Sequence, residues 1–308
     1  MPPRSAGRTR ARRGFSLAEL MISMVLVGVI GAAATKLMLS ESRLYNIQKA
    51  RREARAVSRS STNVLFSDLR MVNLGASAPG SVLIASPETL KVRVPYAFGM
   101  VCGSGAATTA SMFAADSMVS ASAAFAGYAW RDRTTSRFTY VPVGTALTPL
   151  VHSASTSTCL STAQIRVDTV NGRTFQVNGL AGPVDLTPAA PLAQPGAAVF
   201  LYQEVMYWFA RSAVYPDSTR VGLWRRATGA DSVELMAPFD RSAKFTYYRR
   251  GLDAADITTA TSTTTPPLDS IVGVAIALNG SSPTSTITRT PVRTRVVTSV
   301  FFRNRRGF

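Results

Sequence analysis

Hydrophobic and polar positions follow three successive patterns along the chain, and each predicts a different element. The first is a stretch of 20 residues, 15–34, whose only charge is Glu19. A helix rises about 1.5 Å per residue, so this stretch spans about 30 Å, the thickness of a membrane's hydrocarbon layer. Residues 1–14 hold five arginines and no acid. We therefore expect them on the cytoplasmic side of the membrane, and the rest of the chain outside.

The second pattern is amphipathic with a helical period. The 43 residues between Gly31 and Gly75 contain no glycine or proline, so nothing there marks the end of a helix. Apolar and small side chains recur mostly at intervals of three, four or seven residues: Leu44, Ile47, Ala50, Ala54, Val57, Ser61, Leu65, Leu69 and Val72. A helix that continued to Leu74 would be about 90 Å long, so its distal half must pack on a domain.

The opposite surface of this helix half is basic. It carries Lys49, Arg51, Arg52, Arg55 and Arg59. We favour a solvated helix face, because runs of charge usually serve solubility. An acidic partner or lipid headgroups are the functional alternative.

After Gly75 the period changes to two, which is typical of strands. Leu90, Val92 and Val94 alternate with Lys91 and Arg93, and further strands are predicted at 138–143, 164–170, 174–177, 199–209, 221–226, 244–249, 271–278 and 292–303. Turn signals at Asn171-Gly172, Ala181-Gly182-Pro183 and Asn279-Gly280 favour short antiparallel connections. Residues 103–124 and 257–267 are predicted to be loops, the first with a short helix at 112–118 as an option. The predicted fold class is α+β, with a long amino-terminal helix packed on an antiparallel β-rich head.

Composition and charge narrow the chemistry of the head. The chain of 308 residues has a net charge of +17, but residues 75–288 hold 15 basic and 13 acidic side chains. The high charge is therefore weak support for nucleic-acid binding. One histidine, His152, and two cysteines, Cys102 and Cys159, are too few for a zinc site, and no glycine-flanked serine accompanies His152. We expect no catalytic residues, no metal and no cofactor.

The apolar segment has three interpretations, and Glu19 distinguishes them. A cleaved signal peptide would end near Ala32, Ala33 and Ala34, and a plain membrane anchor would stay uncut. Neither explains a carboxylate near the start of the apolar stretch, where insertion scales give a cost of about 2.5 kcal/mol or more.

The third interpretation rests on the residues around the start of that stretch. They read Arg12-Arg13-Gly14-Phe15-Ser16-Leu17-Ala18-Glu19-Leu20 and resemble the processing site of type IV prepilins, basic residues followed by G-F-[ST]-L-x-E. The resemblance implies that a prepilin peptidase cleaves after Gly14, that the new amino terminus at Phe15 is methylated, and that the apolar helix is retained. It also makes Glu19 an assembly contact, whose partner would be the terminal amine of a neighbouring subunit.

Three shorter segments are similar to PilW-like minor pilins and J-type minor pseudopilins: Phe66-Ser67-Asp68-Leu69-Arg70-Met71, Leu223-Trp224-Arg225-Arg226 and Phe302-Arg303-Asn304-Arg305. Asn73 and residues 103–124 depart from that pattern. The resemblance implies a leader at 1–14, a membrane half at 15–34, an amphipathic half at 35–74 and a head at 75–308. It further implies a structural subunit that primes or caps a type IV pilus or a type II secretion pseudopilus, with other minor and major pilins or pseudopilins as partners. Such a subunit would begin in the bacterial inner membrane with a periplasmic head.

Two other functions and one covalent link stay open at this point. The alternative function is a membrane-anchored or exported periplasmic enzyme or binding protein with a prepilin-like leader; a third hypothesis is DNA capture through the arginines of residues 289–306. Cys102 and Cys159 lie 57 positions apart in a region placed outside the cytoplasm, where a disulfide is permitted. Such a bridge would contribute about 4 kcal/mol in the chain-entropy model, and two unpaired buried thiols are the alternative.

Overall fold

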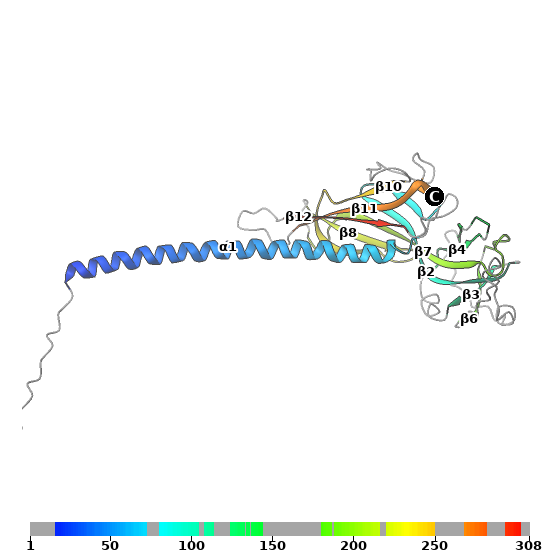
Figure 1. Cartoon of the computed structure of the whole chain (residues 1–308), viewed down its shortest axis with the longest axis horizontal. Coiled ribbons are helices and arrows are strands. Elements are labelled where there is room, and N and C mark those ends of the chain that lie inside the picture. The colour runs from blue at the N-terminus through cyan, green and yellow to red at the C-terminus, as the bar shows by residue number, and fades with distance from the viewer. Residues whose placement is uncertain are drawn as a thin grey trace, which may run out of the picture.

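The computed structural model describes residues 16–72, 80–104, 108–113, 124–132, 134–135, 137–143, 180–186, 188–215, 220–249, 268–281 and 293–302. Figure 1 shows one long helix, α1, that projects from a β-rich head and lies along one side of it with its distal part. The predicted α+β class is confirmed.

Helix α1 runs from Leu17 to Leu69 over 53 residues without a break. Its start is fixed by Ser16, whose side chain accepts a hydrogen bond from the backbone N–H of Glu19 at 3.2 Å. The helix ends five residues before the predicted Leu74, where the backbone N–H of Arg70 donates to the carbonyl oxygens of Phe66 and Asp68. Residues 73–79 lie outside the described part.

The described part of the head contains twelve strands in one antiparallel sheet. They are β1 (Val82–Ala85), β2 (Thr89–Ser104), β3 (Thr108–Phe113), β4 (Gly127–Arg131), β5 (Phe138–Pro142), β6 (Leu180–Leu186), β7 (Ala198–Arg211), β8 (Arg220–Ala227), β9 (Val233–Asp240), β10 (Lys244–Arg249), β11 (Ile271–Ser281) and β12 (Arg293–Phe301), with a short 3-10 helix, η2 (Leu268–Ser270), before β11. The main order is β10-β11-β9-β8-β7-β2-β3-β6; β1 pairs with β2, β12 with β11, and β4 with β5 and β7.

The proximal lobe of the head is the part that α1 covers, formed by β8 to β12 and the near halves of β2 and β7. Leu65 and Leu69 of the helix are fully buried there among Tyr207, Leu223 and other core side chains. Burying a leucine contributes about 1.5–3 kcal/mol, so these residues are strong anchors for the helix.

Small residues let the helix approach the sheet closely. Ala50, Ala54 and Ser58 are buried on the face that meets β11. A Cβ atom at Gly280 of β11 would collide with the carbonyl oxygen of Ala54 and with Ser58 Oγ. Glycine is therefore required at Gly280 for the observed distance between helix and strand.

The distal lobe lies beyond the end of α1, and the far halves of β2 and β7 continue into it (Figure 1). With β3, β4, β5 and β6 they enclose a second core that includes Val101, Tyr128 and Leu201. Arg93, 2% exposed, lies where the two lobes join. Its guanidinium lies 5.1 Å from the ring centroids of both Tyr140 and Tyr202, and it donates a hydrogen bond of 3.0 Å to the carbonyl of Gly80.

Seven of the strands predicted from alternation are confirmed, as β2, β5, β7, β8, β10, β11 and β12. The strands predicted at 164–170 and 174–177, the Asn171-Gly172 turn and the loop at 257–267 lie outside the described residues. No strand was predicted at the positions of β1, β4 and β9.

Three local predictions are wrong. Residues 103–124 are not all loop, since β2 extends to Ser104 and β3 occupies Thr108–Phe113, which also places Met112 in a strand and not in a helix. Ala181-Gly182-Pro183 lies inside β6, which pairs with β3 alone among the described strands, so Pro183 need not donate to a second strand there. Asn279-Gly280 lies inside β11, where the glycine serves the close approach of α1.

Candidate assembly region and its anchor on the head

The sequence places the candidate assembly residues at the membrane end of α1. Gly14 and Phe15, the predicted cleavage and methylation residues, lie outside the described residues. Glu19 is exposed in the first turn of the helix, three residues after the capping residue Ser16. Ser-x-x-Glu is the capping-box pattern, so Glu19 stands where a carboxylate also favours the helix start. This local role was not predicted, although the spacing of Ser16 and Glu19 in the sequence is its signal.

The first 30 residues of α1 make no core contact. Residues 16–46 are all exposed, and the exposed side chains include Leu20, Val25, Val27 and Ile30. An 18-residue window of this helix is long and apolar enough to cross a membrane, and none of that window is buried. Exposed apolar surface of this extent requires a lipid or protein environment.

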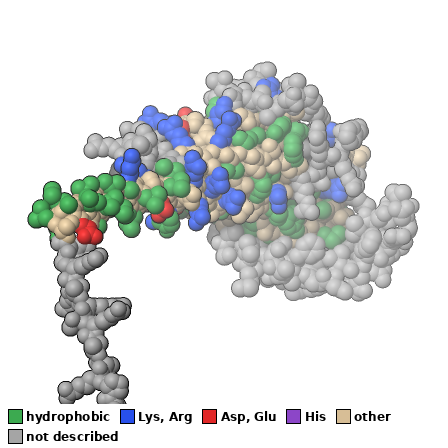
Figure 2. Space-filling view, turned by 60° about the vertical axis from the view of Figure 1, so that its left-hand side comes forward, with side chains coloured by type: hydrophobic (Ala, Val, Ile, Leu, Met, Phe, Trp, Pro, Cys, Tyr) green, Lys and Arg blue, Asp and Glu red, His purple; other side chains and the backbone are tan. Residues whose placement is uncertain are grey.

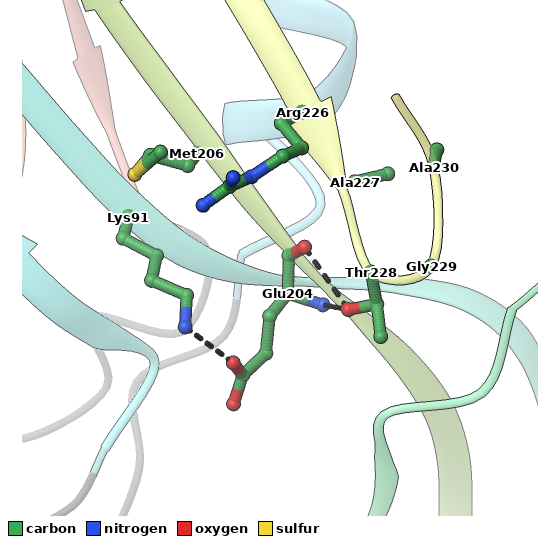
Figure 3. A pocket seen from close by; sticks show the side chains of 8 residues that line it. All are labelled: Lys91, Glu204, Met206, Arg226, Ala227, Thr228, Gly229 and Ala230. Carbon is green, nitrogen blue, oxygen red and sulfur yellow. Dashed lines mark hydrogen bonds and ion pairs between the residues drawn. The ribbon is translucent and has the colours of Figure 1, made fainter. Parts of the chain in front are cut away.

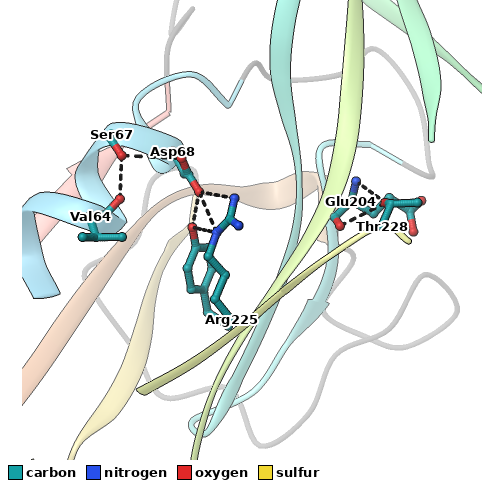
Figure 4. A network of polar contacts seen from close by, with 7 residues as sticks. Val64, Ser67, Asp68, Glu204, Arg225 and Thr228 are labelled. Atoms are coloured by element: carbon teal, nitrogen blue, oxygen red, sulfur yellow. Dashed lines mark hydrogen bonds and ion pairs between the residues drawn. The ribbon is translucent and has the colours of Figure 1, made fainter. Parts of the chain in front are cut away.

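The distal end of α1 is fixed to the sheet by a polar contact (Figure 4). Asp68 Oδ2 accepts a hydrogen bond from the Tyr207 hydroxyl of β7. The same oxygen accepts from Arg225 of β8, at 3.3 Å from Nε and 3.2 Å from a terminal nitrogen of the guanidinium. Arg225 Nε also lies 3.3 Å from the Tyr207 hydroxyl oxygen. One carboxylate therefore ties the last turn of the helix to two neighbouring strands.

The electrostatics of this anchor keep Tyr207 protonated. Burial raises the pKa of the Tyr207 hydroxyl, and the negative charge of Asp68 raises that pKa further. The neutral hydroxyl can therefore donate to Asp68 at all ordinary pH values. Charge-assisted bonds of this kind are about twice as strong as bonds between neutral groups.

The anchor joins two of the segments that carried the family resemblance. Asp68 belongs to Phe66-Ser67-Asp68-Leu69-Arg70-Met71, and Arg225 belongs to Leu223-Trp224-Arg225-Arg226, 157 positions later. From the third segment, Phe302 is buried in the proximal core, and its backbone N–H donates to the carbonyl of Val272 at 3.0 Å. Arg303, Asn304 and Arg305 lie outside the described residues.

A pocket of about 350 Å³ is lined by Lys91, Glu204, Met206, Arg226, Ala227, Thr228, Gly229 and Ala230 (Figure 3). Its carboxylate is already paired, since Lys91 Nζ lies 2.6 Å from a carboxylate oxygen of Glu204. The Thr228 hydroxyl is bonded to the backbone of Glu204. Within the described ranges, no group of three or more His, Cys, Asp or Glu side chains could hold a metal.

Cys102 lies in β2 and is disulfide-bonded. Cys159, like His152, lies outside the described residues. The pairing of Cys102 with Cys159 therefore stays a prediction, which non-reducing peptide mapping of the exported chain would test.

Comparison with known families identifies the amino-terminal segment. A family model described as the prokaryotic N-terminal methylation motif matches residues 9–35, which span Gly14, Phe15 and Glu19. The chain carries a type IV prepilin-like leader. No curated protein and no solved structure matched the chain. The prepilin-like leader implies processing by a prepilin peptidase and assembly with other pilins, and with the apolar part of α1 it is consistent with anchoring in a membrane.

Proposed function

We propose that this chain is a minor pilin or pseudopilin, a structural subunit that primes or caps a type IV pilus or a type II secretion pseudopilus. One observation carries the proposal. The methylation motif extends into an unbroken helix whose first 30 residues are exposed, while the far end of that helix is built into the core of the head. Such a helix suits a subunit that leaves the membrane to enter the apolar core of a filament.

The size of the head favours a subunit used in few copies. A major pilin needs only about 150 residues for one helix and one sheet. Here α1 ends at Leu69, and the head extends through two lobes of a twelve-stranded sheet in the described part alone. The pairing of Asp68 with Arg225 joins two segments similar to the PilW-like and J-type minor subunits, which further supports the assignment.

In this proposal the chain catalyses no reaction and is the substrate of the prepilin peptidase. The mature amino terminus is methylated at Phe15, the head faces the periplasm before assembly, and Glu19 pairs with the terminal amine of an adjacent subunit. Cleavage after Gly14 by a peptidase on the cytoplasmic side would separate this route from ordinary signal cleavage near Thr35.

Deletion of the gene, with complementation by the wild-type chain, tests the proposal. We expect loss of surface filaments if the machine is a pilus, or loss of protein secretion if it is a pseudopilus. The chain should also be present in the purified assembly at a small fraction of the major subunit. Unchanged filaments and secretion, together with absence of the chain from the assembly, would refute the proposal and favour an anchored or exported enzyme or binding protein.

A further inference from the structure

The exposed side of α1 next to the head carries positively charged side chains. Lys49, Arg52, Arg55 and Arg59 recur at intervals of three and four residues, and we call these four residues the basic stripe. All four are exposed, and they lie opposite the buried face formed by Ala50, Ala54, Ser58 and Ser61. Figure 2 shows Lys and Arg side chains gathered where the apolar part of the helix gives way to the head.

The basic stripe has no partner within the described part of the chain. None of its four side chains forms a hydrogen bond or an ion pair there. Packing against the head cannot explain these charges either, because the head contacts the other face of the helix. Like charges at this spacing destabilise an isolated helix by a few tenths of a kcal/mol per pair, and nothing in the described part of the chain offsets that repulsion.

The same part of α1 in a second copy of this chain is a poor partner for the stripe. Residues 36–69 of α1 contain seven basic and three acidic side chains. Of the three acids, Asp68 is engaged by Arg225 and Tyr207, Glu53 is partly buried, and only Glu41 is exposed. Packing the distal part of one helix against the same part of another copy would therefore bring basic side chains together.

We propose that the basic stripe docks a pilin-like subunit of a different sequence, whose helix or head presents an acidic face at the level of residues 49–59. This inference rests on the proposed function, because assembly places helices side by side. Charge complementarity then selects a heterologous neighbour and disfavours self-association. The stripe begins 15 residues beyond the predicted membrane span, about 22 Å along the helix and more than twice the Debye length at physiological salt. That distance favours a protein partner over lipid headgroups for a helix that stands upright in the membrane.

Site-specific photo-cross-linking in the native host tests the inference on the full chain. A photoreactive amino acid at Ala56, which is exposed beside the stripe, should cross-link to another processed prepilin-like subunit, at a segment that contains Asp or Glu. The triple variant Arg52→Glu, Arg55→Glu, Arg59→Glu should lower the cross-link yield about tenfold. Changing the acidic residues of the cross-linked segment to lysine should restore the yield with this variant.

A matched control reverses the same number of charges elsewhere. Arg131, Arg137 and Arg226 are exposed on the head away from residues 49–59 of α1, and their replacement by Glu changes the net charge equally. This control should leave the cross-link at the wild-type yield. Cross-links to a second copy of this chain or to lipid alone would overturn the inference. So would cross-links to a neighbour whose yield is the same with the triple variant as with the wild-type chain.

Failure of this inference is distinguishable from failure of the proposed function. If the wild-type chain is processed at Phe15 and is present in the purified filament, the proposed function stands whatever the cross-links show. If the chain is absent from the filament, the function itself fails.

Discussion

Two roles are proposed for Glu19 at the membrane end of α1: helix capping and filament assembly. As the third residue after the capping residue Ser16, it favours the start of the helix through its position near unpaired backbone N–H groups. As a carboxylate in an apolar segment, it suits a positively charged neighbour in the assembled filament. Substitutions that separate charge from capping distinguish these two tasks.

Glu19→Ala and Glu19→Gln should both be cleaved after Gly14 and inserted in the membrane, and both should enter the filament several-fold less well than the wild-type chain. Glutamine retains the capping-box pattern but lacks the charge, so an equal loss in the two variants assigns the effect to the charge. Co-purification of the processed chains with filament subunits measures it. Wild-type yield for Glu19→Gln and a loss for Glu19→Ala would assign Glu19 to capping alone.

The carboxylate of Asp68 serves the opposite end of the helix. Asp68→Asn keeps the size of the side chain but weakens three hydrogen bonds from Tyr207 and Arg225. The Asp68 and Arg225 side chains are 22% and 31% exposed, so solvent screens the pair and the expected loss of unfolding free energy is about 1–2 kcal/mol. Urea unfolding of a chain that begins at Leu44, which we expect to be soluble without the apolar span, measures the loss. Asp231→Asn, at an exposed acid, is the control, and equal stability of both variants would contradict an anchoring role for Asp68.

Helix and sheet meet most closely at Gly280, and this contact sets the position of α1 on the head. Gly280→Ala places a methyl group against the backbone of Ala54, so the helix must shift. Overpacking of this kind costs about 1–3 kcal/mol. The free energy of unfolding, measured in the same shortened chain, should fall by that amount. Gly103→Ala is the control, because a Cβ there would meet nothing within 4 Å; an equal effect of the two variants would show that the close approach is unimportant.

The elements that sequence could predict are those whose pattern is strong and local. The span of α1 follows from an apolar stretch, an amphipathic stretch and the absence of breakers. The predicted apolar face is buried at Ala50, Ala54, Ser61, Leu65 and Leu69, whereas Leu44 at its start is exposed. The strand β1 has four residues, and β9 contains register irregularities against β8, so neither shows a sustained alternation. Proline and glycine are typical of turns, but Pro183 lies in β6, which pairs with β3 alone among the described strands, and Gly280 lies in β11 at the close contact with α1.

Contacts between distant segments were beyond sequence reasoning. Asp68 and Arg225 lie 157 positions apart, and only the fold brings the end of the helix against β8. Similarity to a family singled out both segments without indicating that they touch. The two-lobed division of the head likewise depends on how far β2 and β7 extend, which alternation over residues 90–94 did not reveal.

At the scale of the whole molecule, buried tyrosines connect the two lobes and make the head sensitive to alkaline pH. Burial raises the pKa of Tyr202 to about 12, although the positive charge of Arg93 acts in the opposite direction. Burial also raises the pKa of Tyr140 and Tyr247. An unfolded tyrosine ionises near pH 10, while these tyrosines stay neutral in the folded head. The unfolded state therefore releases protons first, and stability falls as the pH rises above 10.

We expect the unfolding free energy to be insensitive to tyrosine ionisation below about pH 9. Above pH 10 each such tyrosine should lower it by about 1.4 kcal/mol per pH unit, up to its folded pKa. Urea unfolding at several pH values, with tyrosinate absorbance as the signal, measures this dependence. Tyr202→Phe should be less sensitive than the wild-type head. Ionisation of all tyrosines near pH 10 without unfolding would contradict their burial.

The chemical identity of the mature amino terminus tests the central claim most directly. Mass spectrometry of the amino-terminal peptide, from the chain isolated with the native filament, should find N-methylated Phe15 followed by Ser16. That result would show cleavage after Gly14 and retention of the apolar helix. A terminus near Thr35 would mean ordinary signal cleavage, and an intact Met1 or Pro2 would mean a simple anchor; either result would contradict an assembled pilin-like subunit.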